Sequence, residues 1–139
     1  MSMQSALQSR KEALHRLYRG IEKGDFAFAE MLFTADFISV EGSHQRVVGL
    51  SAFKNEVQAI HDGYTDPRFE ILDMVAEGDD VMVRSRMSAT HTGDLLGIPA
   101  TGKRVSMEEF ALFRFVGDHI SERHAVSDRL GLLQQLRPD

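Results

Sequence analysis

Three carboxylates and a histidine near the C-terminal end of the chain could do acid/base chemistry. They are Glu109, Glu122, His124 and Asp128. An imidazole changes its charge near neutral pH, and a carboxylate that hydrogen-bonds to it fixes its orientation, so such a pair can act as a general base or a general acid. We therefore predict that His124 is the base or acid, that Glu109 orients it, and that Asp128 is a supporting carboxylate.

The pairing of two expected strands would bring these residues together. If Gly117 and Asp118 form a two-residue hairpin turn, a regular register follows for the residues on either side. It pairs Val116 with His119, Phe115 with Ile120, Phe113 with Glu122, Ala111 with His124, Glu109 with Val126, and Met107 with Asp128. Because the aromatic residues must be buried, this register places all four acid/base residues on the buried face, unless a bulge shifts it.

Two interpretations of this polar cluster stay open. Buried charge is costly unless it is paired or hydrated, so the cluster either lines a polar cavity or is a structural ion pair. Glu122 lies nearest the turn, where a place at the cavity rim or a structural role fits best. We expect His91, which leads into a loop, to hold the turn through backbone hydrogen bonds. Arg84 and Arg86 share a strand face with polar residues and should meet solvent or a subunit interface.

The period of the apolar side chains predicts the elements that position these residues. A spacing of three, four and seven residues indicates amphipathic helices, and a spacing of two indicates strands. Helices are expected over about 4–23, 26–33, 51–63 and 128–136, and strands over 37–41, 45–48, 68–77, 81–92, 105–115 and 119–127. Gly24 should end the first helix. Asp25 and Ser51 should cap the second, largely buried helix and the third. A turn is expected at 42–44.

Composition bounds the kinds of protein that this chain can be. Its 139 residues allow one domain, taken here as 1–139. The absence of cysteine excludes disulfide scaffolds and cysteine-ligated metals. A net charge of −5 without a basic block argues against nucleic-acid binding. No apolar run is long enough for a membrane span, and no signal peptide is recognised, so we expect a cytoplasmic protein. No phosphate-loop, dinucleotide, metalloprotease or nucleophile-elbow motif occurs, and no two-histidine metal site is expected.

One stretch of the chain resembles a known family. The segment Ala89–Lys103, ATHTGDLLGIPATGK, is similar to the "GTHTGxxxGIPPTGR" segment of SnoaL-like polyketide cyclases, which belong to the nuclear-transport-factor-2-like superfamily. The tail Leu130–Leu136 matches the usual ending of that family. The resemblance implies an α+β fold in which a cone-shaped, curved, mixed or antiparallel sheet carries about three helices on its concave side. It also implies a pocket between sheet and helices, homodimers, and chemistry without a cofactor.

The chain departs from the family where relatives carry acid/base groups. The last strand of relatives commonly reads E-x-W-D-x-W-D, and Ala125 stands at the first aspartate of that pattern. At three positions where relatives carry tryptophan, this chain has Ser85, His124 and Ser127. Val40 occupies a position that is often polar in relatives. These departures imply an enlarged pocket with His124 in its wall. Four methionines near the sheet would fill the core or suit an adaptable apolar pocket. They are Met74, Met82, Met87 and Met107.

The sequence therefore predicts a small-molecule enzyme that works by general acid/base proton transfer. The substrate would be an apolar, oxygenated small molecule, and the reaction an aldol-type cyclisation, an isomerisation or a hydrolysis. Residues expected to contact the ligand are Tyr18, Phe33, Phe53, Ser85, Met87, Met107, Phe113 and Glu122. The alternatives are a ligand-binding protein of the same fold without catalysis, which the alanine at 125 favours, and an interaction module with a filled pocket.

Overall fold

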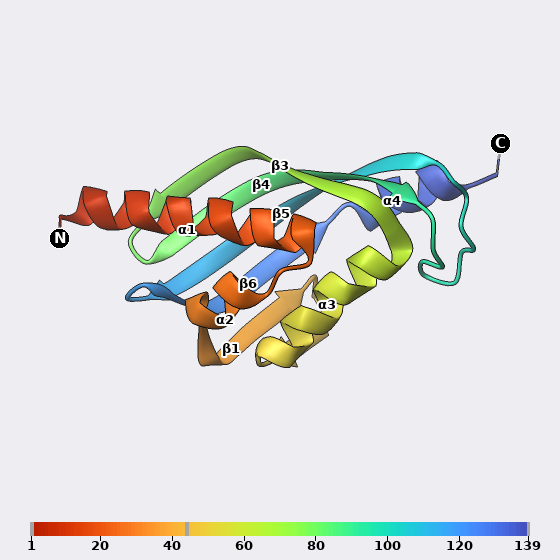
Figure 1. The fold of residues 1–139 in the computed structure, drawn as a ribbon. Coiled ribbons are helices and arrows are strands. Elements are labelled where there is room, and N and C mark those ends of the chain that lie inside the picture. Colours follow the sequence, from red (N-terminus) through yellow and green to blue (C-terminus); the bar gives the residue numbers. More distant parts are fainter. Residues whose placement is uncertain (1, 44, 139) are drawn as a thin grey trace.

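The fold is described from a computed structural model, which covers residues 2–43 and 45–138. In these residues there are four helices and six strands, in the predicted order (Figure 1). They are α1 (Met3–Lys23), α2 (Ala27–Leu32), β1 (Phe33–Glu41), β2 (Gln45–Val48), α3 (Leu50–Gly63), β3 (Tyr64–Glu77), β4 (Asp80–His91), β5 (Arg104–Val116), β6 (His119–Ser127) and α4 (Arg129–Leu136). The predicted α+β class is confirmed. Position 44, in the turn expected at 42–44, lies outside the described residues.

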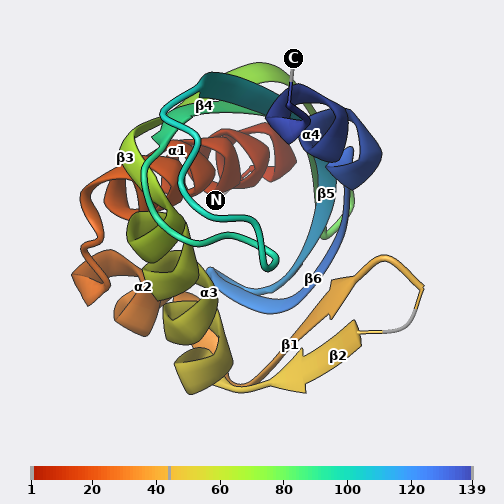
Figure 2. The same cartoon turned by 90° about the vertical axis from the view of Figure 1, so that its right-hand side faces the viewer.

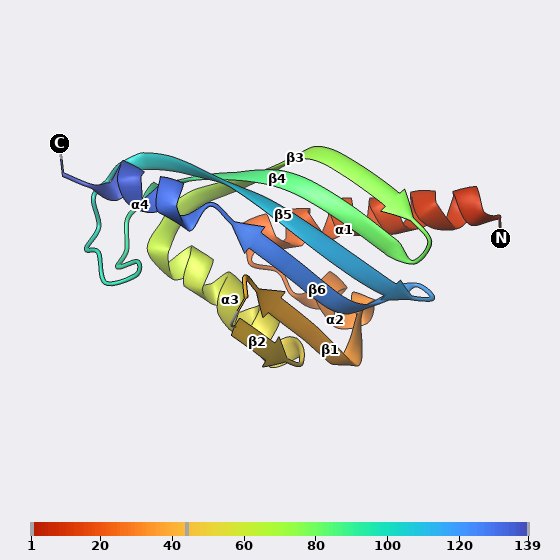
Figure 3. The same cartoon turned by 180° about the vertical axis from the view of Figure 1, so that it is seen from behind.

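The six strands form one mixed, open sheet in the order β2-β1-β6-β5-β4-β3. β1 runs parallel to β6, and the other neighbouring pairs are antiparallel. Helices α1 and α3 lie across one face of the sheet in Figure 1, and Figure 2 shows the sheet curving around α1. In Figure 3, seen from behind, the strands lie in front of these helices. The helices therefore cover the concave side, as predicted.

Helix α1 lies on the sheet because one of its faces is apolar. Leu14, Leu17 and Tyr18 are buried on that face. The helix ends where Gly24 adopts a left-handed backbone with φ of 70°, which confirms the predicted stop. The ring of Tyr18 thereby reaches the inner face of the sheet, where it meets the ring of Phe113 edge-on with 6.3 Å between centroids.

The two following helices differ from their predictions. In α2, Ala29 and Leu32 are buried, but Met31 is 73% exposed, so this helix is less buried than expected. The predicted cap at Ser51 is wrong. Helix α3 begins one residue earlier, after Gly49, and no side chain caps it. Its apolar face still packs inward, and this fixes which of its side chains point toward the sheet and which point toward solvent.

The core lies between the inner face of the sheet and the helices. One cluster joins α1, α2 and α3 to the middle of the sheet, and a second joins α4 to its other end. The buried residues on the sheet side of the first cluster are Phe33, Phe37, Val81, Val83, Ala111, Phe113, Phe115, Ile120 and Ala125. No helix among the described residues is long and apolar enough to cross a membrane.

A β-bulge in the last hairpin changes which residues of β6 face inward. The predicted pairs at the turn are confirmed, with Val116 opposite His119 and Phe115 opposite Ile120. The register then shifts after Phe115, because Ser121 is an extra residue whose hydroxyl donates to the carbonyl of Arg114 at 3.3 Å. Beyond the bulge, the observed pairs are Arg114–Glu122, Phe113–Arg123, Leu112–His124, Ala111–Ala125, Phe110–Val126 and Glu109–Ser127.

The predicted pairing beyond the turn is therefore wrong by one residue. Side chains alternate along a strand, so a slip of one residue moves each of them to the opposite face. Arg123, Ala125 and Ser127 lie on the inner side, where Glu122 and His124 were expected. Met107 does not pair with Asp128, because β6 ends at Ser127.

Candidate functional site

A cavity of about 320 Å³ lies between the concave face of the sheet and helices α1, α3 and α4. Most of its wall is apolar, with side chains from both the helices and the sheet. They include Leu17, Phe53, Val57, Met107, Phe113 and Leu132. Leu95 and Leu96, from the loop between β4 and β5, also line it. Into this apolar wall the fold introduces a small number of polar side chains, which is the usual composition of a small-molecule site.

The polar part of the wall is organised by Arg123. One guanidinium nitrogen donates to Glu41 Oε1 at 2.6 Å and to Ser39 Oγ at 3.3 Å, and the other donates to Glu109 Oε1 at 2.8 Å. The hydroxyl of Ser127 donates to the second oxygen of Glu109 at 2.7 Å. We call Glu41, Arg123 and Glu109 the carboxylate–arginine cluster.

Three neighbouring strands bring this cluster together. Glu41 comes from β1, Arg123 from β6 and Glu109 from β5, and β6 lies between the other two. Glu41 and Ser39 share one face of β1 because they are two residues apart. Arg123 lies directly beside Ser39 across the parallel pair and beside Phe113 across the antiparallel one. The cluster therefore depends on the sheet order and on the bulge that turns Arg123 inward.

The cluster is held in a largely buried environment. The side chain of Arg123 is 12% exposed, that of Glu41 17% and that of Glu109 19%. Burial lowers the pKa of Arg123, but the charges of Glu109 and Glu41 raise it by more, so the pKa of the guanidinium stays above its usual range. A buried charge that is paired on both sides is tolerated, whereas an unpaired one is strongly destabilising.

Tyr18 is a hydrogen-bond donor in the same wall. Burial is the largest cause that raises the pKa of its hydroxyl, and the nearby charge of Glu109 raises it further, while Arg123 and a hydrogen bond with Ser85 lower it. The net pKa lies well above the usual tyrosine range. The hydroxyl of Tyr18 therefore keeps its proton at working pH and can donate a hydrogen bond to an oxygen atom in the cavity.

Glu56 brings a further carboxyl group to the cavity, from helix α3. Burial raises the pKa of Glu56. The charge of Arg123 lowers it, the charges of Glu41 and Glu109 raise it, and Arg129 makes a smaller lowering contribution. The balance leaves the pKa of Glu56 above the ordinary glutamate value.

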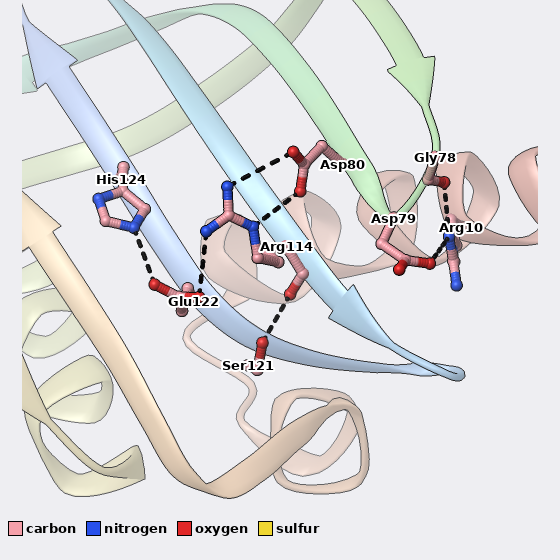
Figure 4. A network of polar contacts seen from close by, with 8 residues as sticks. All are labelled: Arg10, Gly78, Asp79, Asp80, Arg114, Ser121, Glu122 and His124. Carbon is pink, nitrogen blue, oxygen red and sulfur yellow. Dashed lines mark hydrogen bonds and ion pairs between the residues drawn. The ribbon is translucent and has the colours of Figure 1, made fainter.

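His124 and Glu122 lie outside the cavity, on the outer face of the sheet. His124 Nε2 is 3.2 Å from Glu122 Oε1, and Glu122 pairs with Arg114, which in turn pairs with Asp80 (Figure 4). The hydrogen bond to His124 is the largest cause that lowers the pKa of Glu122 below its usual value. The predicted pairing of His124 with Glu109 is not formed, because the two side chains lie on opposite faces.

Asp128 also lies away from the carboxylate–arginine cluster. It precedes α4, and its side chain accepts a hydrogen bond from the backbone N–H of Gly131 at 3.0 Å. This is the geometry of a helix N-cap. Of the three residues expected to carry proton transfer, the structure therefore places Glu109 in the cavity wall, His124 on the outer face and Asp128 at the start of α4.

Half of the predicted ligand contacts line the cavity, and half do not. Tyr18, Phe53, Met107 and Phe113 line it. The other four lie elsewhere for identifiable reasons. Phe33 stacks on Phe37 in the core with 4.2 Å between centroids. Ser85 is buried and hydrogen-bonds to Tyr18. Met87 packs in the core cluster that contains the buried leucines of α4, and Glu122 is on the outer face.

Sequence reasoning missed Glu41, Glu56 and Arg123. Val40, which occupies a position that is often polar in relatives, does not line the cavity, whereas Glu41, the next residue, does. One signal was available: Ile120 and Ala125 are both apolar but are an odd number of residues apart. They can be buried together only if a bulge lies between them, as it does.

Two predictions about neighbouring polar residues are confirmed. His91 holds the turn after β4: its backbone bonds to Lys103 and Gly102, and its Nδ1 accepts from the backbone N–H of Thr101 at 3.2 Å. Arg84 lies on the outer face, where it pairs with Asp73 and Glu108. No cluster of residues that could hold a metal ion occurs in the described parts of the chain.

Comparison with known proteins identifies the class. The family model of SnoaL-like polyketide cyclases matches residues 11–136, which is most of the 139 residues, so the chain belongs to the SnoaL-like polyketide cyclase family. The fold agrees. A solved SnoaL-like polyketide cyclase family protein from Jannaschia sp. CCS1 superposes with a TM-score of 0.86 at 21% identity, over 100% of this chain and 98% of that one. A solved structure from Acidithiobacillus ferrooxidans, described as that of a polyketide cyclase, superposes with a TM-score of 0.83 at 26% identity, over 99% of this chain and 98% of that one.

Curated relatives match over part of the chain. Aklanonic acid methyl ester cyclase DnrD of Streptomyces peucetius is 32% identical over 71 residues, which is 51% of this chain and 49% of that one. Aklanonic acid methyl ester cyclase DauD of Streptomyces sp. (strain C5) is 32% identical over 85 residues, which is 61% of this chain and 47% of that one. The matched regions thus span about half the length of these relatives.

Proposed function

We propose that the chain is a cofactor-independent enzyme that transfers protons next to a carbonyl group and closes a ring by an aldol-type reaction. Its substrate would be an apolar, oxygenated small molecule of the polyketide kind. The observation that carries this proposal is the carboxylate–arginine cluster, set beside the Tyr18 hydroxyl in the wall of an otherwise apolar cavity.

The size and lining of the cavity support the substrate class. A volume of about 320 Å³ lies at the lower end of the range that binds drug-sized ligands. Rings and methyl groups would pack against Phe53, Met107 and Phe113, while carbonyl oxygens would find donors at Tyr18 and Arg123. The cyclase names of the family and of the curated relatives point to the same class of molecule.

The polar groups fit the demands of enolate chemistry. Negative charge develops on a carbonyl oxygen when a proton leaves the neighbouring carbon, and a preorganised donor in an apolar site lowers the energy of that charge. Tyr18 supplies such a donor, because its pKa is too high for it to lose its proton. Arg123 fixes Glu109 and Glu41 in place through its two ion pairs and supplies positive charge next to them.

The test is a paired binding and product experiment. The purified protein is screened by thermal shift against polyketide-like compounds, and each stabilising compound is analysed after incubation by liquid chromatography and mass spectrometry. We expect a stabilising compound to be converted to a cyclised product of equal mass, or of that mass less one water. Stabilisation without any product would contradict the proposal and favour a ligand-binding protein without catalysis.

We also propose that the chain forms a homodimer through the outer face of the sheet. Phe110 and Val126 lie opposite each other on β5 and β6 and are 53% and 65% exposed, and Met82 is 39% exposed on β4. Such exposed apolar side chains on neighbouring strands suit a second copy of the same face. A cytoplasmic location and the lack of nucleic-acid binding stay predictions from the sequence.

A further inference from the structure

One carboxyl group in the cavity has no partner assigned to it. Glu56 projects from α3 on the helix side of the cavity, opposite the sheet that carries the carboxylate–arginine cluster. Among the described residues, no hydrogen bond or ion pair joins Glu56 to another side chain. A half-buried carboxyl that lines an apolar cavity without a partner is costly to the fold, which is a reason to ask what it does.

The other carboxylates of the cavity are engaged. Glu41 and Glu109 are both held by Arg123, and Glu109 also accepts the hydroxyl of Ser127. If Glu41 or Glu109 took up a proton in each turnover, its ion pair with Arg123 would be lost each time. Glu56 can change its charge without breaking any hydrogen bond that the structure shows.

The surroundings of Glu56 favour easy proton exchange. The charged groups that act on it are Arg123 from β6, Glu41 from β1, Glu109 from β5 and Arg129 from α4. Burial and the two carboxylates hold the pKa of Glu56 above its ordinary value, and the two arginines act against them. A carboxyl group with a raised pKa is a stronger base once it is ionised, and a larger fraction of it carries the proton at a given pH.

We propose that Glu56 is the catalytic residue that carries the proton in the cavity, an inference that rests on the proposed function. The ionised carboxylate takes a proton from the carbon next to a substrate carbonyl, and the electron pair moves to that carbonyl oxygen, where Tyr18 donates a hydrogen bond. The enolate carbon then attacks a second carbonyl of the same molecule. The new alkoxide takes the proton back from Glu56, so no proton or electron is gained or lost.

The test uses 5-nitrobenzisoxazole, a small aromatic probe of carboxylate bases. A base removes its ring C–H proton, the N–O bond breaks, and a coloured cyanophenolate forms without any co-reactant. We expect the protein to accelerate this elimination over acetate, with a rate that rises with pH and has its midpoint above the ordinary glutamate pKa. Glu56→Gln should lose about 100-fold of the rate. Glu122→Gln, a matched change on the outer face, should lose none.

A second measurement does not depend on the probe. Carboxyl carbon NMR of the protein labelled at glutamate gives the titration midpoint of Glu56, assigned by its absence in Glu56→Gln. A midpoint at or below the ordinary glutamate value would overturn the proposal, whatever the probe shows. Circular dichroism of each variant establishes that it is folded.

The outcomes separate this inference from the proposed function. If Glu56→Gln keeps the full rate while Glu109→Gln or Glu41→Gln loses it, Glu56 is not the proton carrier, but an acid/base enzyme remains. If the protein does not accelerate the elimination at all, the role of Glu56 is overturned, and the product experiment on polyketide-like compounds decides the proposed function by itself.

Discussion

Arg123 is the residue on which the polar wall of the cavity depends. It is the shared partner of Glu41 and Glu109, so its removal would leave two carboxylates side by side in a largely buried place. We expect Arg123→Met to lower the free energy of unfolding by about 3–5 kcal/mol, because breaking a buried ion pair strands the charge that remains. Urea denaturation measures this loss.

A matched control for that change is Arg114→Met on the outer face. Arg114 also holds two carboxylates, Asp80 and Glu122, but its side chain is 43% exposed and water can replace its contacts. Arg114→Met should therefore lower the free energy of unfolding much less than Arg123→Met does. Equal losses in the two variants would show that the cluster around Arg123 is hydrated rather than buried.

The pH dependence of stability gives a second prediction at the scale of one residue. Since burial raises the pKa of Glu56 in the folded state, the folded protein binds more protons than the unfolded one between the unfolded and folded pKa values of this group. The contribution of Glu56 to the free energy of unfolding is therefore most favourable below its pKa in the unfolded state. It is lost as the pH rises through the pKa of Glu56 in the folded state. Glu56→Gln should therefore become more stable relative to wild type as the pH rises.

Glu122 should show the opposite sign. Its pKa is lowered in the folded state, first by the hydrogen bond to His124, so its contribution is present above the unfolded pKa and is lost as the pH falls through the folded one. Glu122→Gln should lose stability relative to wild type at neutral pH and not in acid. Urea midpoints of the three proteins over a pH series measure both effects, and a common trend for the two variants would contradict the assignments.

At the scale of the element, Asp128 distinguishes the sequence-based role from the structural one. If it caps α4, Asp128→Ala should cost about 1 kcal/mol, while Asp128→Asn, which keeps the accepting oxygen, should cost little. Neither change should alter the elimination rate per folded protein. Loss of that rate in the well-folded Asp128→Asn variant would restore Asp128 to the catalytic group proposed from the sequence.

The elements themselves were largely predictable, because their signals are local. The alternation of apolar residues in β4 and β5 and the glycine after α1 place most boundaries within a few residues of those observed. The bulge at Ser121 is different. Its signal in the sequence is only the odd spacing of two apolar residues, Ile120 and Ala125, yet it exchanges His124 for Arg123 in the cavity wall. The strand was predicted correctly, and the face it presents was not.

The site was less predictable than the fold because its residues meet only through the topology. Glu41 and Arg123 are adjacent because β1 pairs with β6 in parallel, a non-local contact that the spacing of residues along the chain does not reveal. Glu56 joins them only when α3 is laid across that part of the sheet. Glu109 and Tyr18 were predicted because Glu109 lies within a long regular strand and Tyr18 lies on the apolar face of a long helix.

At the scale of the whole molecule, the outer face of the sheet carries the last prediction. The proposed dimer would cover the exposed side chains of Phe110 and Val126. We expect light scattering after size exclusion to give the mass of two chains, and Val126→Glu to give that of one, because two new charges would face each other across a two-fold interface.

Met31→Glu on α2, which is 73% exposed on the helix side, is the matched control and should leave the dimer intact. A wild-type chain that runs as a monomer at all concentrations would contradict the proposal. A monomeric Val126→Glu variant that keeps the elimination rate would show that the cavity of each chain is complete without its partner.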